Sequence, residues 1–134
     1  MGETIGKYLA DLGFDVDFAP VADVLTNQDN TVVARRSFGS DAEIVSRMVS
    51  EEVKGLKKHG VSPVLKHFPG HGGTAEDSHE TKPVLHRTLE ELSETEFLPF
   101  AAGIESGADF VMAGISASRR LKRTAVRLSF PKHC

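Results

Sequence analysis

Residues 61–68 have the sequence VSPVLKHF, and residues 69–74 continue with PGHGGT. The first eight residues form a short apolar run, rich in β-branched side chains and bounded by glycines. Such a run is typical of a strand that is buried on both faces of a parallel sheet. Pro63 cannot donate a ladder hydrogen bond, so it belongs near the start of the strand. We therefore predict a central strand that delivers Lys66 and His67 to a glycine-rich turn.

A helix and a strand are predicted at the start of the chain. Residues 3–12 place apolar side chains at helical spacing, and Gly13 then supplies a left-handed stop. Residues 14–18 alternate between apolar and acidic side chains, which predicts a strand that runs into a loop past Pro20.

A second helix is predicted directly before the central strand. Ser40 and Glu43 have the spacing of a capping box, and Gly60 marks the end of the helix. Its apolar face is formed by Ile44, Val45, Met48, Val49, Val53 and Leu56.

A long loop, a helix and a strand are predicted after the central strand. Residues 69–87 show no periodicity, and a loop of this length in a compact domain is more often functional than idle. Thr88 and Glu91 form a second capping-box pattern, and Pro99 should break or kink the helix that they open. Residues 108–115 form a further apolar strand.

The alternation of helices and strands predicts an α/β fold built of βα units around a parallel sheet. A complete eight-stranded barrel of this kind needs about 250 residues. A chain of 134 residues would hold less than half of one. We therefore expect a partial (β/α)₈ TIM barrel of about three βα units.

The composition is that of an ordinary globular chain, with 40% hydrophobic and 26% charged residues. A formal net charge of -3 gives no global basic field, so neither nucleic-acid nor anionic-membrane binding is expected. The single cysteine, Cys134, excludes an internal disulfide and a thiolate metal site. No apolar run is long enough to cross a membrane, and no signal-peptide pattern is present. The sequence assigns neither a compartment nor an oligomeric state.

The candidate functional residues follow the predicted strands, because the functional groups of parallel α/β sheets lie at the carboxyl ends of the strands. They are Asp23, Arg36, Lys66, His67 and the loop 69–87.

Within that loop, Asp77 and His79 are the most suggestive pair. Residues two apart in an extended segment face the same way, so the carboxylate can orient the imidazole for general acid/base catalysis. The alternative is a surface Asp-x-His without a partner, and Lys66 and His67 could likewise be merely solvated.

Metal binding is a competing hypothesis for the same histidines. The candidate ligands are His67, His71, Asp77, His79 and His86. Two histidines four residues apart work as a ligand pair chiefly on a helix, and the Pro-Gly between the first two prevents one. A nucleotide P-loop is unsupported, because no Gly-Lys-Ser/Thr sequence occurs.

Four blocks of the sequence resemble glycoside hydrolase family 3, specifically its β-N-acetylglucosaminidase branch. The blocks are residues 16–24, residues 36–39, residues 66–74 with Asp77-Ser78-His79, and residues 107–112. The resemblance runs from about residue 13 to residue 112. Each block alone would be only suggestive, whereas the combination is highly specific.

The resemblance implies a barrel enzyme that removes terminal N-acetylglucosamine with retention of configuration, typically from peptidoglycan fragments. Arg36, Lys66 and His67 would hydrogen-bond the sugar, and His79 would be the general acid/base with Asp77 as its partner. The expected partner is a saccharide that contains N-acetylglucosamine, and no cofactor is needed.

The resemblance also implies that this chain is a fragment, because the family's aspartate nucleophile lies on a later strand. We expect residues 1–115 to be a partial catalytic barrel and residues 116–134 to be a divergent basic tail. The isolated chain should then be inactive. The alternatives are a noncatalytic carbohydrate-binding fragment and a metal-dependent hydrolase.

Overall fold

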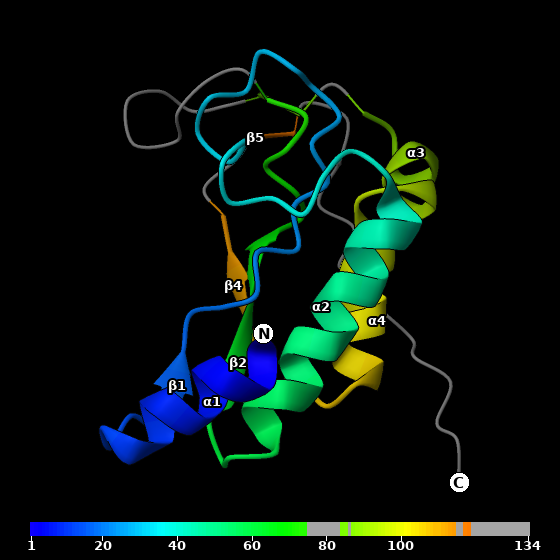
Figure 1. Cartoon of the computed structure of the whole chain (residues 1–134). Coiled ribbons are helices and arrows are strands. Elements are labelled where there is room, and N and C mark those ends of the chain that lie inside the picture. The colour runs from blue at the N-terminus through cyan, green and yellow to red at the C-terminus, as the bar shows by residue number, and fades with distance from the viewer. Residues whose placement is uncertain (75–83, 86, 115–116, 119–134) are drawn as a thin grey trace, which may run out of the picture.

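The computed structural model of the chain describes residues 1–74, 84–85, 87–114 and 117–118. Figure 1 shows α2 and α4 side by side on one side of the strands, and β2 points toward the end where the long loops lie. In chain order the elements are α1 (Gly2–Asp11), β1 (Val16–Asp17), α2 (Ala42–Lys57), β2 (Ser62–Phe68), β3 (Val84–Leu85), α3 (Leu89–Glu94), α4 (Phe97–Glu105), β4 (Phe110–Ala113) and β5 (Ala117–Ser118).

The main sheet is parallel and has the strand order β1-β2-β4. Val16 pairs with Ser62, and Val64 pairs with Phe110. The predicted central strand is therefore confirmed, and Pro63 is its second residue. The predicted α/β class with a parallel sheet is confirmed as well.

β1 is shorter than the predicted strand. It contains only Val16–Asp17, and Val21 continues it as an isolated bridge to Lys66. Pro20 lies between the two and has no N–H for the ladder, which explains the interruption. The strand thus does run into a loop at the predicted place.

The prediction of an unbroken loop over residues 69–87 is wrong at one point. Val84–Leu85 pair in parallel with Ala117–Ser118 and form the small sheet of β3 and β5. A pairing of two residues leaves no periodic pattern in a sequence, so no sequence signal reports it.

The predicted capping box at Ser40 is also wrong. Helix α2 is capped by Asp41, whose Oδ1 accepts hydrogen bonds from the backbone N of Glu43 at 2.9 Å and of Ile44 at 3.0 Å. Aspartate is as good an N-cap as serine, and here it directly precedes the first helical residue. The start of the helix therefore moves by one residue.

The buried face of α2 largely follows the predicted stripe. Val45, Val49, Val53 and Leu56 are fully buried, whereas Ile44 and Met48 are 45% and 43% exposed. The last two lie at the margin of the stripe.

The break between α3 and α4 falls before Pro99 rather than at it. The capping box that opens α3 is confirmed, with Thr88 and Glu91 bonded in both directions. The chain leaves the helix at Thr95 and re-enters it at Phe97. Pro99 lies in the first turn of α4, where its missing N–H leaves no helical hydrogen bond unmade.

The core lies between the sheet and the helix layer. Phe68 at the end of β2 stacks on Phe97 and meets Phe100 edge-on, both at centroid distances of 5.4 Å. Phe100 is 2% exposed, and burying a side chain of this size fully contributes about 1.5–3 kcal/mol. The central cluster consists of Ala22, Val24, Val45, Val49, Val53, Leu65 and Phe100.

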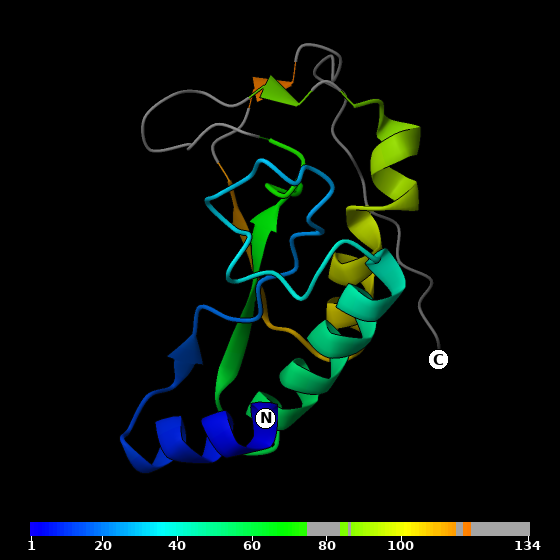
Figure 2. The same ribbon diagram turned by 45° about the horizontal axis from the view of Figure 1, so that its top comes forward.

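The other side of the sheet carries no helix among the described residues, as Figures 1 and 2 show. Phe18 next to β1 is 60% exposed. In the edge strand β4, the consecutive residues Phe110 and Val111, which face opposite sides of the sheet, are 53% and 43% exposed. No helix in the described part of the chain is long and apolar enough to cross a membrane.

Candidate functional site

The buried carboxylate of Asp23 is the centre of the candidate site. Asp23 follows β1 and is 0% exposed. Its Oδ1 accepts hydrogen bonds from the backbone N of His71 at 2.7 Å and of His67 at 3.2 Å, and its Oδ2 lies 2.8 Å from Nδ1 of His67. Because a carboxylate only accepts, Nδ1 of His67 carries the hydrogen. The outer Nε2 of this ring is then left as an acceptor.

Lys66 and His67 lie at the carboxyl end of β2, as predicted. Lys66 pairs with Met112 and Phe68 pairs with Ala113, so the register shifts at His67. Such an irregularity re-aims the side chain of the residue that it frees. The peptide bond between Lys66 and His67 is cis.

The two side chains differ in how firmly they are held. The side chain of His67 is 20% exposed and bound to Asp23. Lys66 is half-buried and forms no ion pair with any residue that the structure describes. One group is thus fixed in orientation, and the other has an ammonium that can donate to a ligand.

The glycine-rich turn after β2 is fastened to the loop that follows Asp23. Asn30 is fully buried, and its Nδ2 donates to the carbonyl of His71 at 2.7 Å. A Cβ atom on Gly72 would lie 1.9 Å from the carbonyl oxygen of Val24, so a side chain cannot fit there. The turn therefore has a fixed path over the end of the sheet.

The third predicted sugar-binding residue, Arg36, forms no hydrogen bond or ion pair with Lys66 or His67 in the part of the chain that the structure describes. It is exposed, and its Nη2 donates to the carbonyl of Val32 at 2.9 Å. The following residue, Ser37, donates from Oγ to the carbonyl of Asp23 at 2.7 Å. The backbone beside Arg36 is thereby anchored to the centre of the site.

The predicted acid/base pair, Asp77 and His79, lies outside the described residues, as does the candidate ligand His86. The dyad therefore stays a prediction.

The described residues offer no group of three or more His, Cys, Asp or Glu side chains that could hold a metal ion. The rings of His67 and His71 meet edge-on at 6.1 Å, and their Nδ1 atoms face Asp23 and Thr74, both at 2.8 Å.

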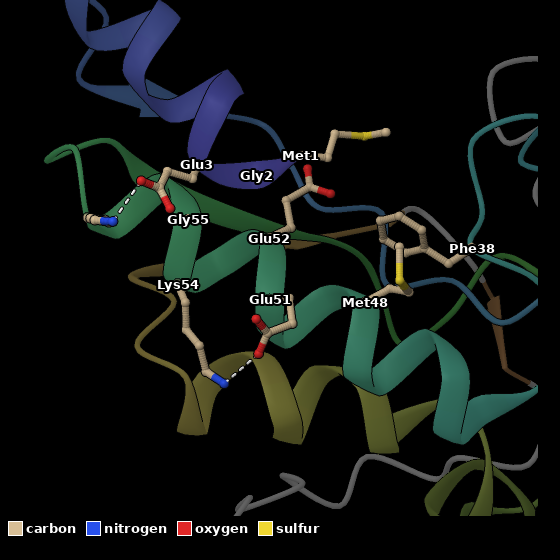
Figure 3. A pocket seen from close by; sticks show the side chains of 10 residues that line it. Met1, Gly2, Glu3, Phe38, Met48, Glu51, Glu52, Lys54 and Gly55 are labelled. Carbon is tan, nitrogen blue, oxygen red and sulfur yellow. Dashed lines mark hydrogen bonds and ion pairs between the residues drawn. The ribbon is translucent and has the colours of Figure 1, made fainter.

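A pocket of about 310 Å³ lies between α1 and α2, and none of the site residues lines it. Figure 3 shows its floor, where Glu52 of α2 lies beside Met1 and Gly2. Burial raises the pKa of the Glu52 carboxyl, and the negative charge of Asp17 adds to the effect. We do not assign this pocket to the candidate site.

Sequence reasoning placed Asp23 at a strand end but gave it no role. Its signal was a single carboxylate within the apolar run from Val21 to Val24, a pattern that predicts a buried and therefore partnered charge. Asn30 was missed altogether. It closes a polar stretch that resembles any surface loop.

Residues 1–126 match the family described as glycosyl hydrolase family 3 N terminal domain. The chain belongs to this family.

Solved and curated relatives of this family 3 chain are consistent with the match. A β-hexosaminidase of Stenotrophomonas maltophilia is 40% identical over 100 residues, which are 75% of this chain and 29% of that protein. A family 3 β-N-acetylglucosaminidase from a Paenibacillus species has a TM-score of 0.87 and 38% identity, covering 92% of this chain and 24% of its own. NagZ from Neisseria gonorrhoeae, in complex with N-trifluoroacetyl-D-glucosamine, has a TM-score of 0.77 and 35% identity, covering 87% and 35%. The chain thus spans about a third or less of the length of these relatives.

Proposed function

We propose that this family 3 chain is part of a glycoside hydrolase that removes terminal N-acetyl-β-D-glucosamine residues. The observation that carries the proposal is the Asp23–His67 pair beside Lys66 at the carboxyl end of the central strand. Barrel enzymes bind their substrates at this end of the strands. The printed names of the relatives support the choice of an N-acetylated sugar.

The described residues supply both kinds of hydrogen bond that a sugar needs. The Lys66 ammonium donates to ring hydroxyl oxygens, while Nε2 of His67 accepts from a hydroxyl because Nδ1–H is committed to Asp23. Arg36 would add a second cationic donor once its guanidinium turns from the carbonyl of Val32 to the sugar.

For the chemistry itself, we propose that His79 is the general acid/base and that Asp77 orients it. His79 would protonate the leaving oxygen while a carboxylate attacks the anomeric carbon, and it would then deprotonate the water that releases the sugar. The nucleophile would come from a strand outside this chain, since residues 1–115 would form only about three of eight βα units. Peptidoglycan fragments are the proposed natural substrate, and residues 116–134 are a proposed divergent tail.

An exchange experiment tests the proposal. Residues 13–112 of this chain would replace the matching segment of the Stenotrophomonas maltophilia β-hexosaminidase, with 4-nitrophenyl N-acetyl-β-D-glucosaminide as substrate. We expect the exchanged enzyme to turn over, and His79→Ala to lower turnover by roughly 10²–10⁴-fold. The matched control is Ser78→Ala, the neighbouring residue, which should have little effect.

Two outcomes would contradict the proposal. A folded exchanged enzyme without turnover would contradict the proposed function. Unchanged turnover in His79→Ala would contradict the assignment of His79 and Asp77 as the acid/base pair. The isolated 134-residue chain should not hydrolyse the substrate at all.

A noncatalytic carbohydrate-binding role is favoured by one observation, namely that the described residues place Lys66 beside the Asp23–His67 pair, while the proposed nucleophile lies outside this chain. Calorimetry with N-acetylglucosamine on the isolated chain would detect such binding. A metal-dependent hydrolase would instead lose its activity with a chelator, which the proposed mechanism does not predict.

A further inference from the structure

Glu96 is a charged side chain that the proposed chemistry does not use, and it is only 1% exposed. It lies in the break between α3 and α4. Its Oε1 accepts hydrogen bonds from Nη1 of Arg87 at 2.5 Å and from Oγ1 of Thr26 at 3.4 Å. A carboxylate at this depth is tolerated only where a cation and hydrogen-bond donors replace its lost hydration. Arg87 and Glu96 therefore fix one another in place.

The Glu96 side chain also lies directly against the glycine-rich turn after β2. A Cβ atom on Gly70 would lie 2.7 Å from Cγ of Glu96, and one on Gly73 would lie 3.7 Å from its Oε1. Gly70 has a φ of 124°, which disfavours any other residue there. The backbone of the turn thus rests on the buried carboxylate with no side chain between them.

The glycine-rich turn is in contact with His67, the proposed sugar-binding histidine. The backbone N of Gly70 donates to the carbonyl of His67 at 2.7 Å. The next residue, His71, donates to Oδ1 of Asp23 at 2.7 Å, and Asp23 binds the ring of His67. The close approach of Glu96 to Gly70 and the hydrogen bonds from the turn therefore connect Glu96 to His67.

The two residues of the ion pair are also linked to the two ends of residues 75–86, which contain Asp77 and His79. Glu96 lies against the turn 70–73, which comes just before these residues in the sequence, and Arg87 comes directly after them.

We propose that the Arg87–Glu96 ion pair is a positioning device for the sugar-binding turn. It holds residues 70–73 in place and thereby fixes Asp23 and His67 in the orientation that the sugar meets. The binding of sugar by His67 rests on the proposed function, whereas the hold on the turn does not.

The competing explanation is that the pair only stabilises the α3–α4 break. In that case its loss would weaken the whole domain evenly. Amide hydrogen exchange followed by NMR separates the two, because it reports local opening residue by residue.

The test measures exchange on the 134-residue chain and on Glu96→Gln and Arg87→Met. We expect the amides of Gly70 and His71 to exchange at least about tenfold faster, since their bonds at the site loosen. The amides of Val49 and Val53 in α2 should change much less. Arg87→Lys, which keeps a cation for Glu96, should restore protection relative to Arg87→Met. The matched control is Glu90→Gln, an exposed glutamate on α3.

An equal acceleration of all four amides would overturn the proposal, and so would unchanged exchange at Gly70 and His71. Should the substitutions at Glu96 or Arg87 prevent folding, Thr26→Val removes one donor to the same oxygen more gently. It should accelerate the same two amides, and a uniform or absent effect in that variant would equally contradict the proposal.

A second measurement keeps this inference apart from the proposed function. N-acetylglucosamine would be titrated into the isolated chain and its Glu96→Gln variant, and the variant should bind at least about tenfold more weakly. Unaltered affinity together with a loosened turn would overturn the claim that the pair positions His67. A chain that does not bind the sugar at all would count against the proposed sugar-binding role of Lys66 and His67. The hydrogen-exchange data would still decide the role of the ion pair.

Discussion

At the scale of single residues, two carboxylates are almost completely buried in the described part of the chain. Asp23 and Glu96 are 0% and 1% exposed. Both oxygens of Asp23 face N–H donors, whereas in Glu96 only Oε1 accepts hydrogen bonds and Oε2 has no partner among the described residues. Removing the partners of such a group leaves an unpaired charge in the interior, which typically costs about 3–5 kcal/mol. Both residues therefore act first as constraints on the loops that supply their donors.

Glu52 is a different case, because its half-buried carboxyl is shifted toward the protonated form. Burial raises its pKa, and Asp17 adds to the shift. The folded chain thus holds this proton more tightly than the unfolded chain does. Stability must fall as the pH rises from the unfolded-state pKa of about 4.3 through the raised folded-state pKa.

We predict that Glu52→Gln gains stability relative to the natural chain as the pH rises through that window. Scanning calorimetry at about pH 4 and about pH 7 would show a larger difference in Tm at the higher value. The lowered pKa values of Glu3 beside Lys58 and of Asp109 beside Lys57 act in both proteins and cancel in the difference. The control is Glu51→Gln on the same helix. A difference in Tm that is independent of pH would contradict the assignment.

At the scale of elements, close helix packing depends on glycine at the crossing of α1 and α2. A Cβ atom on Gly55 would lie 2.3 Å from the backbone N of Glu3 and 2.4 Å from the carbonyl carbon of Gly2. Figure 3 shows Gly55 directly facing the first residues of α1. The two backbones therefore touch without a side chain between them.

We predict that Gly55→Ala destabilises the chain by roughly 1–3 kcal/mol, because the added methyl group forces the helices apart. Helix propensity alone would give the opposite sign, a gain of about 1 kcal/mol. Urea unfolding measures the difference, and the exposed neighbour Lys54→Ala serves as a near-neutral control. A stabilised Gly55→Ala would show that α1 does not pack on α2 in this way.

The elements also show how far a sequence can be interpreted. Strong local patterns were sufficient for β2, the stripe of α2 and the Thr88 capping box, because each is decided within a few residues. The Asp41 cap, the break before Pro99 and the two-residue β3 were not, since they depend on competition among neighbours or on a distant partner. The same limit applies to the site. The position of Lys66 and His67 at the end of β2 could be predicted, whereas the contacts of Asn30 and Glu96 arise only where loops distant in sequence meet.

At the scale of the whole molecule, the sheet has a covered side and an open side. β1 and β4 are the edge strands of the order β1-β2-β4. Apolar side chains at both edges are exposed, among them Phe18 and Phe110. Unpaired edges with exposed apolar side chains favour association with further strands.

We predict that the isolated chain self-associates as its concentration rises. Sedimentation velocity over a dilution series would show the average mass increasing, and Phe18→Lys combined with Phe110→Lys would reduce the effect by placing charges at both edges. Tyr8→Lys on α1 is the matched control, since that exposed side chain lies away from the sheet. A monomer at every concentration, with the natural sequence, would contradict the prediction.

The register of the sheet has a consequence for how the chain is made. Val16 pairs with Ser62 and Val64 with Phe110, and both partners are 46 residues apart (62 − 16 and 110 − 64). A ribosome that adds about 5–20 residues per second needs about 2–9 s for each such interval. When β2 emerges, its β1 partner and the covering helix α2 are already complete, but β4 is not. The edge of β2 that pairs with β4 therefore stays unpaired for seconds during synthesis. In that interval it can pair with strands of neighbouring nascent chains.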